Sequence, residues 1–300
     1  MVRVIQGGLE LVEPATVELV PADTRTPVVA SLNLSPEPGN IEGNLLLAER
    51  AITAAKQAHP ALDWVVLPEL FTSAYSGLAQ IHQYAEPALE GESVRFFSRL
   101  ARELGVHIAY GFPEQLPVGG VADSVNLIGP SSGPEEPGVL MTYRKRHLVR
   151  TTGEDMVFVP GAELPVIEAG GLRVTLVVCW DLGFPEVVRE AALAGAELIL
   201  ASAGWRDPWG AQYELSCAAR ALDNAVYLAS ANQIGVYPEA SFGTAGGVYG
   251  PDGTLVSEGV DVSGGVLGIA EVDPGFPERW RGFYGDPVLE RRNLSLEACS

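Results

Sequence analysis

The stretch Arg173-Val-Thr-Leu-Val-Val-Cys179-Trp-Asp-Leu-Gly-Phe-Pro-Glu186 predicts a buried strand, a sharp turn and the start of a helix. Residues 174–178 form a nearly continuous apolar run, which is typical of a strand covered on both faces. Gly183 suits the turn, and Pro185 suits the first position of a helix. Cys179 therefore lies where the strand ends, close to the positive end of a helix, a position that favours a thiolate. From this stretch alone, a structural buried cysteine is an equally good interpretation.

Strands and helices alternate in each half of the chain, and antiparallel hairpins follow. We expect helices after Asn40 and at about 93–104, 185–194 and 210–223, with strands at 28–34, 63–71 (ended by Pro68), 106–112, 124–129, 139–145, 164–168, 172–179, 198–202, 225–232 and 266–272, and a hairpin at 247–256. Two sheets packed face to face, each covered outside by helices, would bury these strands, giving an α/β fold of four layers (αββα). A single doubly wound sheet is the competing architecture.

The composition predicts one large domain and excludes several classes of partner. The chain has 300 residues, of which 47% are hydrophobic, and nothing resembles a linker between two halves. The formal charge of −19 argues against nucleic acid and against anionic membrane surfaces. Three widely spaced cysteines make a poor disulfide framework, and no apolar run would span a membrane, so we expect a cytoplasmic protein. No residues at ligand spacing indicate a metal.

Three ionisable side chains follow strands in the way that active-site residues do in α/β sheets. Glu69 and Lys145 come directly after predicted strands, and Glu154 lies in the irregular segment behind Lys145. Each alone is most simply a solvated charge. Together with Cys179 they form a coherent set, because a thiol nucleophile needs a carboxylate base and a developing oxyanion needs a positive charge or an amide donor. A papain-like pairing of Cys179 with His147 is a weaker alternative.

The motifs Leu-Pro-Glu69-Leu-Phe, Tyr-Arg-Lys145-Arg-His-Leu and Val-Val-Cys179-Trp-Asp-Leu-Gly-Phe-Pro-Glu resemble the three signature motifs of the carbon–nitrogen hydrolase (nitrilase) superfamily, in the family's order. The resemblance covers about residues 27–293. It implies the αββα sandwich, a homodimer or larger homo-oligomer, and catalysis without a cofactor. It also implies that Glu69 is the general base, Lys145 stabilises the oxyanion, Cys179 is the nucleophile, and Glu154 is a second glutamate that positions the site.

The resemblance suggests a division of the chain into an N-terminal extension (1–26), the carbon–nitrogen hydrolase domain (27–275) and a C-terminal tail at an oligomer interface (276–300). Residues behind the nucleophile and behind the next strand should line the substrate pocket; these are Tyr75, Trp180, Leu182, Gly183, Trp205 and Arg206. Relatives that bind a substrate carboxylate often carry arginine where this chain has Leu182-Gly183. The sequence therefore predicts an uncharged, apolar or aromatic acyl group, although Arg206 could bind a carboxylate instead.

Asp181 bears on the type of reaction. True nitrile hydrolysers commonly carry glutamate after Cys-Trp, whereas aspartate is more usual among amidases and carbamoylases. We therefore expect hydrolysis of a small amide or N-carbamoyl compound through a thioester at Cys179, releasing ammonia or an amine. Hydrolysis of a nitrile through a thioimidate is the alternative within enzymes. A catalytically silent binding protein on the same fold is the alternative outside them.

Overall fold

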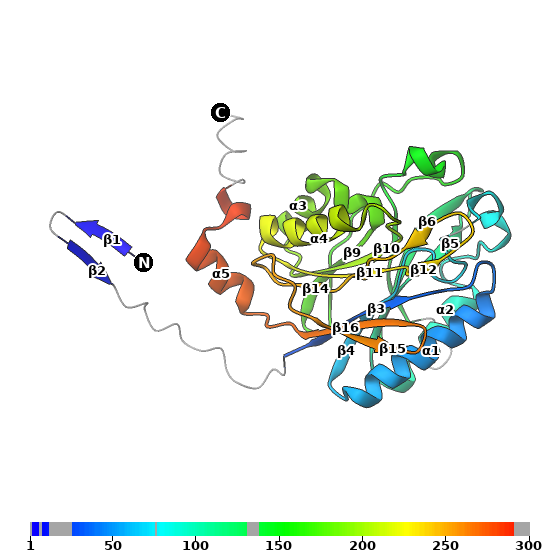
Figure 1. The fold of residues 1–300 in the computed structure, drawn as a ribbon, viewed down its shortest axis with the longest axis horizontal. Coiled ribbons are helices and arrows are strands. Elements are labelled where there is room, and N and C mark those ends of the chain that lie inside the picture. Colours follow the sequence, from blue (N-terminus) through cyan, green and yellow to red (C-terminus); the bar gives the residue numbers. More distant parts are fainter. Residues whose placement is uncertain (1, 6–7, 12–25, 76, 131–137, 291–300) are drawn as a thin grey trace.

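A computed structural model describes residues 2–5, 8–11, 26–75, 77–130 and 138–290 of the chain (Figure 1). Two short N-terminal strands, β1 (Val2–Ile5) and β2 (Gly8–Leu11), pair antiparallel with each other. Strands β12 (Gly235–Val236) and β13 (Ser241–Phe242) form a second small antiparallel sheet, and the other described strands belong to two larger sheets, one of seven strands and one of five. Cys299, the last of the three cysteines, lies outside the described residues.

The seven-stranded sheet has the order β15-β16-β3-β4-β5-β6-β7. Strands β3, β4 and β5 are parallel, and every other neighbouring pair is antiparallel, so β7 runs in the same direction as β4. Helices α1 and α2 cover its outer face, and Gly105 ends α2 with a φ of 64°, as its sequence predicts. The bounds are β3 (Val28–Leu34), α1 (Ile41–Ala58), β4 (Leu62–Val66), α2 (Glu92–Leu104), β5 (His107–Gln115), β6 (Val121–Ile128), β7 (Val139–Arg144), β15 (Glu258–Val262) and β16 (Gly265–Glu271).

The five-stranded sheet has the order β14-β11-β10-β9-β8, in which β9, β10 and β11 are parallel. Helices α3 and α4 cover the face turned away from the first sheet (Figure 1). Gly170 and Gly171 both have positive φ and make the predicted tight turn between β8 and β9. The bounds are β8 (Ile167–Ala169), β9 (Leu172–Val178), α3 (Pro185–Leu193), β10 (Leu198–Ala203), α4 (Gly210–Asn224), β11 (Tyr227–Asn232) and β14 (Val248–Tyr249).

The two sheets pack face to face, and alternation along the strands divides each strand between the two faces. In β4, Trp64 and Val66 point into the core between the sheets, whereas Val65 packs under the helices. The αββα sandwich is therefore confirmed, and the alternative of a single doubly wound sheet is wrong. Polar groups also tie the sheets together where they meet: the Ser202 hydroxyl donates to the Leu67 carbonyl at 2.7 Å.

The structure corrects two sequence expectations away from the core. Residues 258–262, predicted as no particular element, form the edge strand β15, whose charged and glycine residues are mostly exposed and give little hydrophobic signal. The predicted tail contains helix α5 (Phe276–Tyr284), with Pro277 in its first turn. No helix among the described residues is long and apolar enough to cross a membrane. The domain boundaries and the oligomer interface stay predictions.

Candidate active site

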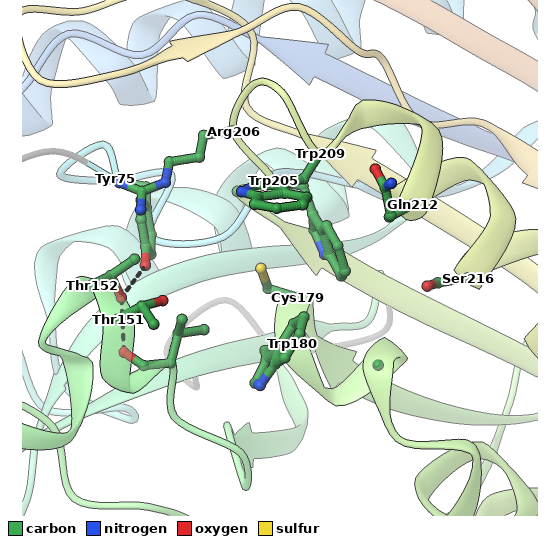
Figure 2. A pocket seen from close by; sticks show the side chains of 13 residues that line it. Tyr75, Thr151, Thr152, Cys179, Trp180, Trp205, Arg206, Trp209, Gln212 and Ser216 are labelled. Atoms are coloured by element: carbon green, nitrogen blue, oxygen red, sulfur yellow. Dashed lines mark hydrogen bonds between the residues drawn. The ribbon is translucent and has the colours of Figure 1, made fainter.

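Cys179 sits at a strained turn between β9 and the short 3-10 helix η4 (Cys179–Gly183). Its φ is 46°, in the left-handed region that non-glycine residues rarely adopt, and such strain is characteristic of functional sites. The residue is 6% exposed, and the backbone of Gly204, just after β10, hydrogen-bonds its sulphur. Figure 2 shows the sulphur turned into a pocket rather than into the core.

Asp181 holds this turn in place. One carboxylate oxygen accepts hydrogen bonds from the backbone N–H of Val178 at 3.1 Å and from the Tyr143 hydroxyl at 2.8 Å. The other accepts from both the backbone N–H and the ring Nδ1 of His147, at 3.0 and 2.8 Å. Asp181 is fully buried and does not line the pocket. It therefore positions the turn around Cys179, and His147 is occupied with Asp181 rather than directed at the cysteine.

Glu69 and Lys145 meet because β4 and β7 run in the same direction and end at the same edge of their sheet. The Lys145 ammonium donates to Glu69 Oε1 at 2.6 Å, and both side chains are completely buried. The backbone after β4 crosses to the second sheet, where the Glu69 N–H donates to the carbonyl of Ala203 at 3.2 Å. This crossing brings the Glu69 carboxyl towards Gly204, on which a Cβ would stand 2.7 Å from Glu69 Oε2.

Glu154 completes the surroundings of the lysine from the 3-10 helix η3 (Glu154–Met156). Its Oε2 accepts from Lys145 Nζ at 2.8 Å and from the Val149 N–H at 2.8 Å. Its Oε1 accepts a short hydrogen bond from the Tyr75 hydroxyl, which also contacts Thr152 (Figure 2). The Tyr75 ring lies 5.9 Å from the ammonium. Tyr75, predicted only as a pocket residue, is therefore also part of the charged cluster.

Asp123 is a further carboxyl of the cluster, and no motif in the sequence indicates it. It lies at the start of β6, fully enclosed, with Oδ2 3.5 Å from Lys145 Nζ. The residues two and four positions further along the strand, Val125 and Leu127, pack in the core between the sheets, so a carboxylate interrupts an apolar face. That interruption in a period of two is the signal that identifies it.

Burial dominates the protonation of the cluster. Burial, followed by the charge of Glu69, raises the pKa of the Cys179 thiol well above its ordinary value, although Lys145 opposes this. Burial also raises the pKa of Glu69, again against Lys145. For Lys145, burial alone would lower the pKa, but the negative groups around it, led by Glu69, outweigh burial and raise it. Burial therefore outweighs the stabilisation of a thiolate that the position of Cys179 after a strand and near a helix favours, and the cysteine needs a base, next to a lysine whose pKa is raised.

The pocket that contains Cys179 has a volume of about 520 Å³ and a mainly apolar wall. Five of the six predicted substrate-binding residues line it: Tyr75, Trp180, Gly183, Trp205 and Arg206. Leu182 needs correction, because it is fully buried and its carbonyl accepts a hydrogen bond from Arg220 Nε at 3.0 Å. The other side of the pocket comes from loops and from α4, and no sequence motif indicates its residues: Val149, Thr151, Thr152, Gly204, Trp209, Gln212 and Ser216.

Comparison with known proteins gives a consistent family. A family model described as carbon-nitrogen hydrolase matches residues 28–281. A probable nitrilase of Schizosaccharomyces pombe is 31% identical over 274 residues, which cover 89% of this chain and 98% of that protein. The 2-oxoglutaramate amidase of Bacillus subtilis is 30% identical over 212 residues, covering 70% and 78%. The solved structure of an amidase variant from Nesterenkonia sp. AN1 in complex with acrylamide matches with a TM-score of 0.72 at 26% identity, covering 88% of this chain and 97% of that one.

Proposed function

Since this chain belongs to the carbon–nitrogen hydrolase family, and is thus an enzyme that hydrolyses carbon–nitrogen bonds, we propose that it cleaves small uncharged amides through a thioester at Cys179. The observation that carries the proposal is the buried ion pair of Lys145 with Glu69, 2.6 Å long. The pair lies directly behind Tyr75 and Gly204, two residues that line the pocket of the cysteine. An acid–base group, a fixed positive charge and a nucleophile are the three parts that acyl transfer requires.

In the proposed reaction, the Cys179 thiol gives its proton to Glu69 while the sulphur attacks the amide carbonyl. The negative charge that develops on the carbonyl oxygen is stabilised by the Lys145 ammonium and by the backbone N–H of Trp180. Glu69 then returns the proton to the leaving nitrogen, so that ammonia or an amine departs and a thioester remains. Glu69 next takes a proton from water, whose oxygen attacks the thioester and releases the acid and the free thiol.

Protonation of the resting site supports this assignment. Because burial raises the pKa of Cys179, the free enzyme holds a thiol, and a base must remove its proton in the reaction itself. Burial raises the pKa of Glu69 too, which brings a carboxylate closer to the range where it can both take and return a proton. Lys145 keeps its charge and is therefore suited to stabilise an oxyanion rather than to transfer protons.

The shape and chemistry of the pocket support an apolar or aromatic substrate. Trp180 and Trp205, whose ring centroids are 5.4 Å apart, lie on opposite sides of the Cys179 sulphur in Figure 2. The indole N–H of Trp205, a residue of the pocket wall, is buried without a partner among the described residues, so an acceptor atom of a substrate placed against it would satisfy this donor. Arg206 is the one charged residue of the lining; it lies at the boundary with a neighbouring, smaller pocket.

We expect ammonia release from neutral amides to exceed release from amides of dicarboxylic acids and from nitriles. With propionamide, 2-phenylacetamide, succinamate and benzonitrile as probes, kcat/KM for 2-phenylacetamide should exceed that for succinamate by about tenfold or more, because the mainly apolar wall desolvates a carboxylate at a cost. A preference for succinamate would reject the uncharged acyl group and point to Arg206. Ammonia from benzonitrile but from no amide would favour a nitrilase, and no acyl adduct on Cys179 from any probe would favour a silent binding protein.

Gly183 is expected to set the size of the substrate. A Cβ on this residue would lie 3.4 Å from the Trp180 ring, an ordinary contact, so Gly183→Ala should fold and act normally. Gly183→Leu should fill the space beside Trp180 and lower kcat/KM for 2-phenylacetamide by about tenfold or more, while propionamide changes by less than about threefold. Equal losses for both substrates in Gly183→Leu would show that the residue acts on the turn around Cys179 and not on substrate size.

A further inference from the structure

Asp123 is a buried carboxyl to which the proposed reaction gives no task. It enters the cluster from the first turns of β6, where its backbone carbonyl accepts from the N–H of Lys145 at 2.8 Å. The side chain is 0% exposed, as are those of Glu69, Lys145 and Glu154. Since water does not reach it, the carboxyl must be satisfied by its neighbours or remain uncharged.

The neighbours do not satisfy Asp123 as a carboxylate. Neither of its oxygens accepts a hydrogen bond from any donor in the described part of the chain. The Lys145 ammonium stands 3.5 Å away, longer than a good hydrogen bond, and is engaged at 2.6 and 2.8 Å by Glu69 and Glu154. Glu154, by contrast, receives Lys145, the Val149 N–H and the Tyr75 hydroxyl.

What Asp123 does meet is the carboxyl of Glu69, at hydrogen-bonding contact. Two carboxylates cannot hydrogen-bond each other, because both are acceptors, so this contact requires a proton between them. Glu69 Oε2 is likewise without a conventional donor among the described residues. A proton between the two carboxyls thus accounts both for their contact and for the absence of other donors to their oxygens among the described residues.

The balance of charge gives the same answer. The titratable groups that face Asp123 and Glu69 are Lys145 from the end of β7, Glu154 from η3, Tyr75 from the loop after β4, and Cys179 from the end of β9. One ammonium cannot balance three enclosed carboxylates. Burial, and then the charge of Glu69, raise the pKa of Asp123 well above its ordinary value, which makes it the group that keeps the proton.

We propose that Asp123 is a positioning residue that stays protonated, donates a hydrogen bond to Glu69, and so holds the base in its ionised form and in a fixed orientation. This inference rests on the proposed function, because it assigns Asp123 a task through Glu69. A hydrogen bond donated by Asp123 favours the carboxylate form of Glu69 and lowers the pKa of that group, which partly offsets the effect of burial.

The test compares Asp123→Asn with Asp123→Leu. The asparagine N–H can replace the donated proton, so Asp123→Asn should keep kcat/KM for 2-phenylacetamide within about fivefold and leave the acid limb of its pH profile in place. Leucine has similar size but no donor. Asp123→Leu should therefore move the acid limb to higher pH by about one unit and lower kcat at neutral pH, with less change in KM.

Three results would overturn the proposal. A shift of the acid limb to lower pH in Asp123→Asn would mean that Asp123 is ionised and acts on Glu69 by charge. An unmoved profile in a folded Asp123→Leu would mean a purely structural role. An infrared band of a protonated carboxyl at pH 7, present in the wild type and lost in Asp123→Asn, tests the protonation without activity; its persistence in the variant contradicts the assignment. An absent Cys179 acyl adduct in the wild type would refute the proposed function alone, since the infrared result stands independently.

Discussion

Replacing Cys179 with alanine is expected to lower kcat/KM for amide hydrolysis by about 10⁴-fold or more, because removal of a covalent nucleophile leaves only binding and oxyanion stabilisation. The change removes one sulphur atom from the pocket wall and leaves the contacts of Asp181 that hold the turn. The substrate should therefore still bind. The measurement is ammonia release from 2-phenylacetamide, together with the intact mass of enzyme quenched during turnover, which should show an acyl adduct in the wild type and none in Cys179→Ala.

Cys217 supplies the matched control. It is completely buried on α4, and burial raises the pKa of its thiol to about 12, so it is an inert apolar side chain at neutral pH. Cys217→Ala should retain activity within about threefold and keep the adduct, with only a modest loss of stability from the missing sulphur. Full activity in Cys179→Ala would falsify the thioester mechanism. Loss of the adduct in Cys217→Ala would mean that Cys217, and not Cys179, is the nucleophile.

The sequence predicts those parts of the molecule that rest on strong local patterns. The apolar run before Cys179, the proline at the start of α3 and the glycine after α2 each fix one element by a local physical rule, and all three elements are present. The edge strand β15 is not predicted, because an exposed strand needs no apolar residues and therefore gives no hydrophobic pattern. Helix α5 lies in a segment that the sequence predicts as a tail because the residues after 272 are rich in proline and arginine, although proline is well placed in a first helical turn.

The site was predicted as a set of residues but not as an electrostatic arrangement. Three separate segments supply Glu69, Lys145 and Glu154. Their contacts become visible only in the structure, in which β4 and β7 end at the same edge of the sheet and η3 packs against Lys145. The position of Cys179 after a strand predicts a lowered pKa of the thiol, whereas burial raises it. The sequence position carries no information about how deeply the side chain is buried. The prediction that Leu182 lines the pocket is wrong for a similar reason. Adjacent residues in a tight turn point to opposite sides, so of these two only Gly183 faces the pocket.

Replacing Lys145 with methionine is expected to lower kcat/KM by about 10³-fold or more, because it removes a fixed charge at the developing oxyanion. It should also destabilise the protein by about 3–5 kcal/mol at pH 8, because Glu69 and Glu154 lose their shared counter-charge inside a closed site. Methionine keeps most of the length and the apolar stem of lysine, so lost packing contributes little. Denaturant unfolding of the wild type and the variant at pH 5 and pH 8 measures the second effect.

The dependence on pH separates loss of charge from loss of packing. The raised pKa of Lys145 means that its contribution is complete below the unfolded value and is lost only at more alkaline pH, so it is constant between pH 5 and 8. The raised pKa values of Glu69 and Asp123 rise further without the ammonium, so the variant loses stability as pH rises through them. The loss of unfolding free energy in Lys145→Met should therefore be smaller at pH 5 than at pH 8.

Lys56, the chain's other lysine, supplies the control. It donates to the Leu62 carbonyl on the far side of the first sheet, and Lys56→Met should show neither the catalytic loss nor the pH dependence. An equal deficit at both pH values in Lys145→Met would mean that the ammonium is not the counter-charge of the buried carboxyls.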